Sequence, residues 1–277
     1  MAAAETPAGP PRAVFLLESL EILCMGMLWT SLPILLESDS QPQRYGVVTG
    51  VASAIALATG AVFGRLSDVH GRQLVLLVAV SMFAASNILL FAAQLPLWEA
   101  VGVAPATLLI LGALLGRCSS TSGSLRKAYV ADTSPAAERT AALGKLAACG
   151  GCGFIVGPTL AGRLADVDVA YAVQAQLLLA AGSVAIAASV WHSSAPAAVA
   201  TKTKAATPTE PFSYTELLFA NRAVGGLMLA SFFLSFGFQA FTSSFYLFVV
   251  RRFDFGPKEY GQLLSCLGAI PPACFFL

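Results

Sequence analysis

Long apolar stretches recur along nearly the whole sequence, and they constrain the fold more than any other feature. Each is about 20 residues long, which is the length that an α-helix needs to cross the hydrocarbon core of a bilayer. Hydrophobic residues occupy 57% of the 277 positions and charged residues only 11%, against about 25% charged residues in ordinary soluble domains. The sequence therefore predicts an all-α polytopic membrane protein. The expected membrane-spanning stretches are residues 13–36, 45–65, 73–95, 105–128, 140–163, 170–192, 223–250 and 258–277.

The order of these stretches predicts a six-helix bundle followed by the start of a second bundle. Residues 1–12 are rich in Pro and Ala and are expected to form a disordered tail before the bundle of residues 13–192. Residues 193–222 are polar and rich in Ala, Thr, Pro and Lys, which is typical of a flexible linker. Residues 223–277 are expected to hold helices seven and eight of the chain.

A short repeat favours two related halves. The motif Pro-x-x-Tyr-Gly opens the second apolar stretch at Pro42 and the eighth at Pro257, an offset of 215 residues. The same offset places the sister position of Gly64 at residue 279, beyond Leu277. We therefore expect the chain to lack the last four helices of a twelve-helix design.

The distribution of Lys and Arg predicts a cytoplasmic N-terminus and a cytoplasmic linker. With that orientation ten basic residues lie on the cytoplasmic side and five on the other, as the positive-inside rule requires. The ten are Arg12, Arg65, Arg72, Arg126, Lys127, Arg139, Lys145, Lys202, Lys204 and Arg222. The five are Arg44, Arg163, Arg251, Arg252 and Lys258. The net charge of +1 gives no reason to expect a nucleic-acid partner, and nothing in the sequence indicates which membrane holds the chain.

A polar interruption separates the second and third apolar stretches. It reads Gly-Arg-Leu-Ser-Asp-Val-His-Gly-Arg and runs from Gly64 to Arg72. Gly64 and Gly71 permit a tight turn, and Asp68 can accept from a helix N-terminus or an arginine in one conformation and lose that contact in another. We interpret Gly64, Asp68, Gly71 and Arg72 as a gating loop. The alternative is that these charges only anchor the loop and set the topology.

Two ionisable residues are expected inside the bilayer. Arg117 lies near the middle of the fourth stretch, where insertion of an arginine costs about 2.5–3.5 kcal/mol, so we expect it to face a central cavity. Glu21 lies about 5 Å from the midpoint of the first stretch and is a candidate for a substrate or proton path, with a purely structural role as the alternative. Glu18 shares its helix face but is expected at the solvated cytoplasmic boundary. An Arg117–Glu21 ion pair is a hypothesis that rests on their similar depth.

Gln239 is the candidate polar residue of the seventh stretch. It is surrounded by aromatic residues, a mixture that suits a cavity for an amphipathic organic molecule. Hydrogen bonding between helices is the alternative interpretation.

Small residues recur along the fifth stretch, at Gly144, Gly153, Gly157 and Gly162, with Pro158 among them. Such spacing gives a flat face that allows close helix packing, and a proline can bend the helix. We interpret these five residues as a packing motif.

Catalytic and metal-binding patterns are not found. The Cys-Gly-Gly-Cys sequence at residues 149–152 lies within the small-residue face and has no second Cys or His pair near it, so it is expected to pack. No phosphate loop, nucleophile elbow or zinc-binding spacing appears. We therefore expect no metal, no cofactor and no enzyme activity.

Three of these segments resemble signatures of the major facilitator superfamily. The Gly64–Arg72 segment is similar to its loop between helices two and three, although Val69 and Gln73 replace the usual basic residues. The Gly153–Gly162 segment is similar to the helix-five signature of antiporter branches, with Ala161 where glycine is usual. The end of the fourth stretch resembles the superfamily's cytoplasmic cap, with matches at Asp132, Thr133, Pro135, Glu138 and Arg139.

The resemblance is strongest to the tetracycline-resistance-type drug:proton antiporters and their orphan eukaryotic relatives. It implies two six-helix bundles, a substrate site between them at the membrane midplane, and alternating access. The expected function is transport of a small organic solute, with proton-coupled antiport as a further expectation. The expected partners are that solute and the lipid bilayer, and no protein partner is indicated. The alternative is a truncated membrane protein that binds or scaffolds without transporting.

Overall fold

The computed structural model describes the chain except residues 1–9, 38–41, 97–101, 103, 194–221 and 276–277. Most of the expected N-terminal tail and of the expected linker therefore lies outside the described residues. Contacts divide the chain into a first unit, residues 1–195 with 255–277, and a second unit, residues 196–254. The last helix therefore belongs to the same contact unit as the N-terminal helices. The partial second bundle expected over residues 223–277 stays a prediction.

All regular elements among the described residues are helical. The first unit contains α1 (Arg12–Glu37), α2 (Pro42–His70), α3 (Arg72–Ala92), α5 (Pro105–Cys118), the 3₁₀ helix η1 (Ser119–Thr121), α6 (Ser122–Thr133), α7 (Arg139–Val167), α8 (Val169–Ser193) and α12 (Pro257–Phe275). The second unit contains α11 (Arg222–Phe253).

Within the described part of the chain, six helical segments are long and apolar enough to cross a membrane, and they match the first six predicted stretches. The fourth is built from α5, η1 and α6 and runs over Pro105–Thr133. It ends five residues later than the predicted boundary at residue 128, because α6 continues until the Ser134-Pro135 step stops it. The seventh and eighth predicted stretches form α11 and α12. The expectation of an all-α polytopic membrane protein is confirmed.

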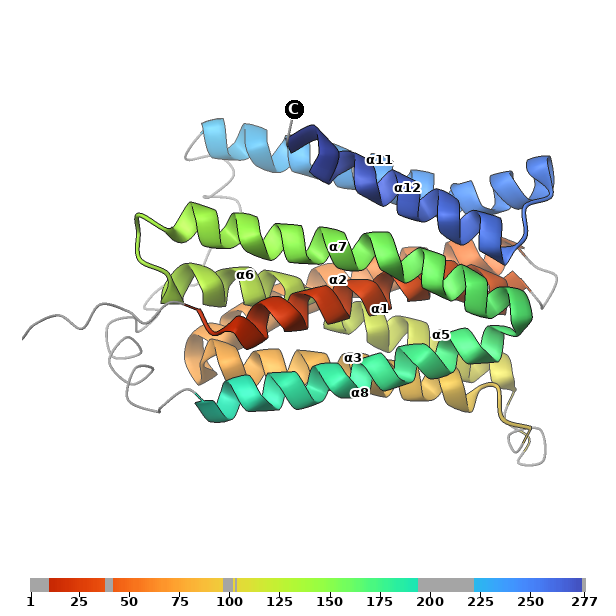
Figure 1. The fold of residues 1–277 in the computed structure, drawn as a ribbon, viewed down its shortest axis with the longest axis horizontal. Helices are drawn as coiled ribbons and strands as arrows, with labels where there is room; N and C mark the ends of the chain where they lie inside the picture. Colours follow the sequence, from red (N-terminus) through yellow and green to blue (C-terminus); the bar gives the residue numbers. More distant parts are fainter. Residues whose placement is uncertain (1–9, 38–41, 97–101, 103, 194–221, 276–277) are drawn as a thin grey trace, which may run out of the picture. The chain divides into compact units, whose positions relative to one another are not determined.

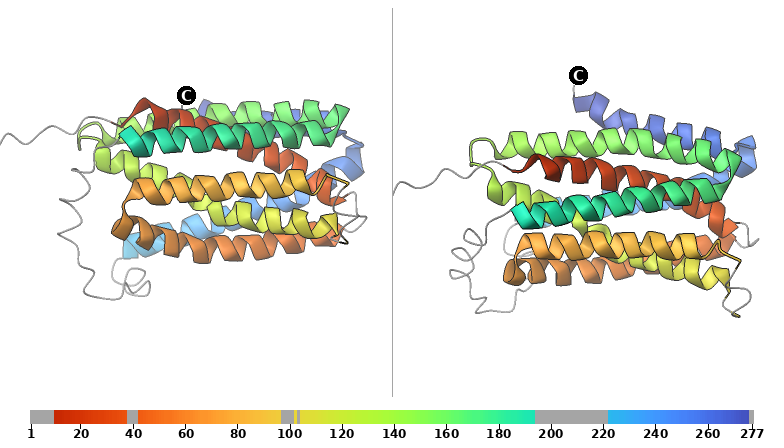
Figure 2. Two further views of the ribbon diagram at one scale, coloured as in Figure 1. Left: turned by 90° about the horizontal axis from the view of Figure 1, so that it is seen from below. Right: turned by 60° about the horizontal axis from the view of Figure 1, so that its bottom comes forward.

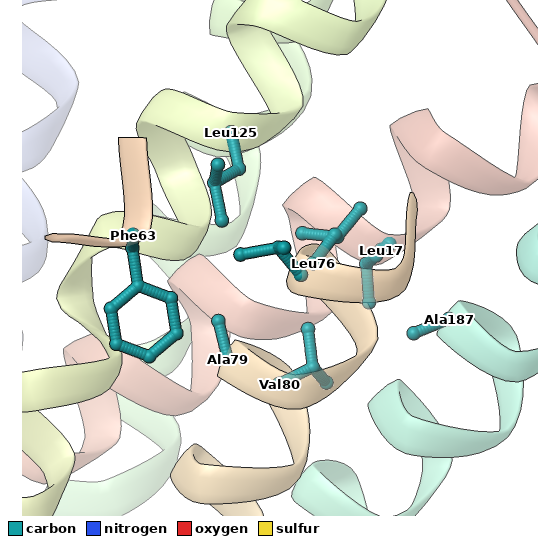
Figure 3. Close-up of a cluster of buried hydrophobic side chains, with 8 residues drawn as sticks. Leu17, Phe63, Leu76, Ala79, Val80, Leu125 and Ala187 are labelled. Carbon is teal, nitrogen blue, oxygen red and sulfur yellow. The ribbon is translucent and has the colours of Figure 1, made fainter. Parts of the chain in front are cut away.

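Inside the first unit, α1 lies along α7, and α3 lies between α5 and α8 (Figures 1 and 2). Figure 3 shows one of the buried clusters that join these helices. Leu17 of α1, Leu76 of α3 and Leu125 of α6 meet there, with Phe63 of α2 and Ala187 of α8 at its edges. The core therefore ties α6 to α1 and α3, which fixes where the side chains of α6 can reach.

Glycines bring α7 into backbone contact with α1. A Cβ added at Gly153 would lie 2.4 Å from the carbonyl oxygen of Ser19, and one added at Gly157 would lie 2.3 Å from that of Leu23. Real Cβ atoms essentially never approach an atom so closely. The contact also depends on a glycine of α1, because a Cβ added at Gly26 would lie 2.8 Å from the ring of Pro158 on α7.

A different face of α7 packs against α12. A Cβ added at Gly162 would lie 2.6 Å from the carbonyl oxygen of Pro257, and one added at Gly261 would lie 2.3 Å from that of Pro158. The hydroxyl groups of Thr159 and Ser265 are hydrogen-bonded at 2.7 Å across the same contact. The two small-residue faces of α7 therefore hold a helix on either side.

Replacing Gly157 by Ala should destabilise the first unit by about 1–3 kcal/mol, because the new methyl group meets a backbone atom that has no room to move. The measurement is thermal unfolding of the full chain in detergent. Gly144→Ala is the matched control, since a Cβ at Gly144 meets nothing within 4 Å. Equal melting temperatures for the two variants would contradict the close α1–α7 contact.

Candidate functional site

A buried arginine holds two buried glutamates at the centre of the first unit. Arg126 of α6 is 1% exposed, and its Nε donates to Oε2 of Glu18 while its Nη1 is paired with Oε2 of Glu21. The two glutamates are 5% and 4% exposed. A charge removed from water in this way is tolerated only where opposite charges and hydrogen bonds surround it.

The local sequence explains this geometry. Glu18 and Glu21 lie three residues apart on α1 and so share a face. Ser122 and Arg126 lie four residues apart on α6 and share a face in the same way, and the Ser122 hydroxyl donates to Oε2 of Glu21 at 2.9 Å. Gly150 of α7 covers Glu18 so closely that an added Cβ would lie 3.1 Å from its Oε1.

The cluster carries more negative than positive charge. When both glutamates are ionised, two carboxylates face one guanidinium, so the net charge of the three groups is −1. Oε1 of Glu21 is buried and has no hydrogen-bond partner among the described residues. Glu21 and Arg126 also line a cavity of about 60 Å³, which is room for roughly four water molecules. The remaining lining residues are Ile22, Met25, Phe83, Ser119, Ser120, Ser122 and Gly123. This arrangement can accept a proton or a cationic group at Glu21.

The prediction for Glu18 was wrong. Glu18 is not solvated, because α6 and α7 cover it. Arg126 lies two residues before the predicted end of the fourth stretch, and the helix continues beyond it to Thr133. Glu21 is paired with Arg126. Arg117 is partly buried on α5, and its pairing with Glu21 stays a hypothesis. Extending the predicted helix to Asp132 would have placed Arg126 almost two turns inside it and revealed the pair.

A second group of charges joins two segments that were predicted separately. The guanidinium of Arg72, at the start of α3, donates to Oδ2 of Asp132 near the end of α6 and also lies 3.5 Å from Oδ1 of Asp68. The adjacent Gln73 donates to the hydroxyl of Tyr129 at 3.1 Å. Gly71 between α2 and α3 has φ 91°, a backbone conformation that favours glycine.

The other predicted site residues differ in their surroundings. Arg139 is exposed at the start of α7, and Gly64 and Gly144 have open space where a side chain would be. Gln239 lies on α11, and its side chain is outside the described residues. No group of three His, Cys, Asp or Glu residues that could hold a metal ion occurs in the described part of the chain.

The chain is similar in sequence to tetracycline resistance proteins and to a solute carrier protein. The chain is 29% identical over 159 residues to a class H tetracycline resistance protein of Pasteurella multocida, which covers 56% of this chain and 37% of that protein. It is 32% identical over 170 residues to human solute carrier family 67 member A1, which covers 60% of this chain and 38% of that protein. A class G tetracycline resistance protein of Vibrio anguillarum is 24% identical over 263 residues, 92% of this chain and 63% of that protein. The chain thus spans less than two thirds of the length of these relatives.

The family profile gives the broadest match. The profile described as Major Facilitator Superfamily matches residues 14–277, which is nearly the whole chain. Proteins of this superfamily are transporters, not enzymes, and generally need no cofactor. The chain therefore belongs to the Major Facilitator Superfamily.

Proposed function

We propose that the chain works in a secondary transporter that moves a small organic solute by alternating access in exchange for protons. The observation that carries this proposal is Oε1 of Glu21, which has no hydrogen-bond partner among the described residues and lies at the edge of a cavity of about 60 Å³. The sequence similarity to tetracycline resistance proteins supports transport of an organic solute. The excess of basic residues on one side of the helices supports a cytoplasmic N-terminus.

The charge balance explains how Glu21 would carry the proton. With Glu21 ionised, the second carboxylate adds a buried negative charge that Arg126 cannot also neutralise. Protonation of Glu21 at Oε1 leaves a neutral Glu18–Arg126 pair. A cationic group of a solute at the same cavity would supply the same compensation, so proton and solute would exclude each other, as exchange requires.

The Asp68–Arg72–Asp132 group would act as the gate on the cytoplasmic side. Its members come from α2, α3 and α6, so separation of these helix ends breaks the contacts. Their side chains are 29–68% exposed, and a pair exposed to this degree contributes only about 0.2–1 kcal/mol. A contact of that strength can form and break during a transport cycle.

Flux in proteoliposomes tests the proposed function. Tetracycline is the first probe solute, because the relatives are named for resistance to it. We expect an imposed pH gradient to drive tetracycline across the membrane and its collapse to stop the flux. A folded chain that binds tetracycline but moves none across the membrane would instead support the alternative of a non-transporting binding protein.

Glu21→Gln should remove the proton-binding group while leaving the chain folded, because Arg126 keeps Glu18 as its partner. Infrared difference spectra between acidic and alkaline buffer should lose the band of a protonated buried carboxyl group, and flux should lose its pH dependence. Glu259→Gln is the control, since Glu259 is exposed at the start of α12. An unchanged carboxyl band in Glu21→Gln would rule out Glu21 as the carrier, with or without transport of the probe.

Arg126→Gln should destabilise the chain by about 3–5 kcal/mol, because two buried carboxylates lose the cation that both of them contact. The measurement is the melting temperature in detergent at neutral and acidic pH. Acid should partly restore stability, since protonated carboxyl groups need no cation. Equal losses at both pH values would show that packing and not charge accounts for the effect.

Arg72→Ala should loosen the junction between α2 and α3 and raise hydrogen exchange there by up to about fivefold, the equivalent of about 1 kcal/mol. The charge-swapped variant Arg72→Asp with Asp132→Arg, made together with Asp68→Asn so that two carboxylates do not meet, should restore slow exchange, because the pair with position 132 is re-formed with its polarity reversed. Arg139→Ala serves as the control at an exposed arginine outside this group. If the swap exchanges as fast as Arg72→Ala, the pair does not hold the junction closed.

A further inference from the structure

Two lysines lie well inside helices of the bundle yet remain exposed. Lys127 is six residues before the end of α6, and Lys145 is six residues after the start of α7. At 1.5 Å per residue each lies about 9 Å from its helix end. Such a depth corresponds to the boundary between lipid headgroups and hydrocarbon, where ammonium groups lie close to phosphate.

The packing of α6 on α7 places these lysines at the same level. Val130 of α6 and Ala142 of α7 belong to one buried cluster, and each lies three residues from the end of its helix at the connecting turn. Lys127 and Lys145 are each three residues further from that turn. Because the helices run antiparallel, the two side chains are level with each other on neighbouring helices.

Neither lysine has an ion-pair partner among the described residues. Of the nearest carboxylates on α1 and α6, Glu18 is buried against Arg126 and Asp132 is paired with Arg72. Gly144 leaves open space beside Lys145, where an added Cβ would meet nothing within 4 Å. Two exposed positive charges without an ion-pair partner among the described residues therefore lie on neighbouring helices.

An exposed apolar row continues from Lys145 along α7. Ala148, Cys152 and Val156 follow it at intervals that keep them on one helix face, and all three are exposed, Val156 by 51%. This face is separate from the one that packs on α12 through Pro158 and Gly162. A pair of cations at one end of an apolar row has the shape and polarity of a phospholipid binding surface.

We propose that Lys127 and Lys145 together bind the phosphate of an anionic phospholipid whose acyl chain lies along Ala148, Cys152 and Val156. Two ammonium groups can donate to different phosphate oxygens, and an additional headgroup charge strengthens the attraction. Basic pockets between transmembrane helices are known to select anionic headgroups in this way. The site is independent of the proton-binding cluster and does not require transport.

Native mass spectrometry of the full chain in a non-ionic detergent tests the site. The probes are phosphatidylserine and phosphatidylcholine with identical acyl chains, and soluble glycerophosphoserine. We expect saturable binding of phosphatidylserine that is clearly tighter than that of phosphatidylcholine. Each basic residue near an anionic surface is worth about a fivefold gain in affinity, so Lys127→Gln with Lys145→Gln should weaken phosphatidylserine binding by about 30-fold.

Two further variants keep the test specific. Lys127→Arg with Lys145→Arg should retain phosphatidylserine binding, which shows that charge at these positions is sufficient. Lys258→Gln removes an exposed lysine at the start of α12 and should also retain it. Equal phosphatidylserine affinity in the double glutamine variant and the unmodified chain would overturn the proposal. Equally tight binding of glycerophosphoserine would overturn it too, because the site would then take a free phosphate and not a lipid.

Discussion

The buried guanidinium of Arg126 is the constraint on which the arrangement of the first unit depends. A charge this far from water needs opposite charge within reach, and among the described residues α1 supplies it, through Glu18 and Glu21. That requirement fixes the height and rotation of α6 against α1. The same requirement explains why α7 carries small residues where it crosses α1. Gly150 leaves room for the Glu18 carboxylate, and Gly153 lets the two backbones come into contact.

Stability alone accounts for one of the two glutamates. A single carboxylate neutralises a single guanidinium, and Glu18 is held by Nε of Arg126 without lining the cavity. Glu21 adds a second buried charge and leaves Oε1 without a partner among the described residues. An excess buried charge weakens a fold that has no use for it. The second carboxylate beside a cavity of about 60 Å³ therefore fits the proposed proton exchange better than a purely packing role.

Hydropathy predicted the helices well, because it reports the length of an apolar stretch. It did not predict the charge cluster, because it does not tell which face of a helix each side chain lies on. The fourth stretch was predicted to end at residue 128, just after the adjacent residues Arg126 and Lys127. In the structure α6 continues through both, and the 100° between neighbouring residues puts Arg126 inside and Lys127 outside. Glu18 was misplaced for a related reason, because depth along α1 was judged without the helices that cover it. The close packing at Gly153 and Gly157 could be predicted without knowing the neighbouring helix, because small residues at this spacing allow any helix backbone to approach.

The helix α6 links the two charge groups mechanically. Arg126 lies on it about 9 Å before Asp132, with no irregular turn between them. The irregularity comes earlier, at the 3₁₀ turn of Ser119–Thr121, where α6 departs from α5. A shift of Arg126 that follows a change of charge at Glu21 is therefore carried along α6 to the Arg72–Asp132 contact, and not dissipated within α6. Under the proposed function, the buried Glu21 site and the exposed Arg72–Asp132 contact would respond to the same event through α6.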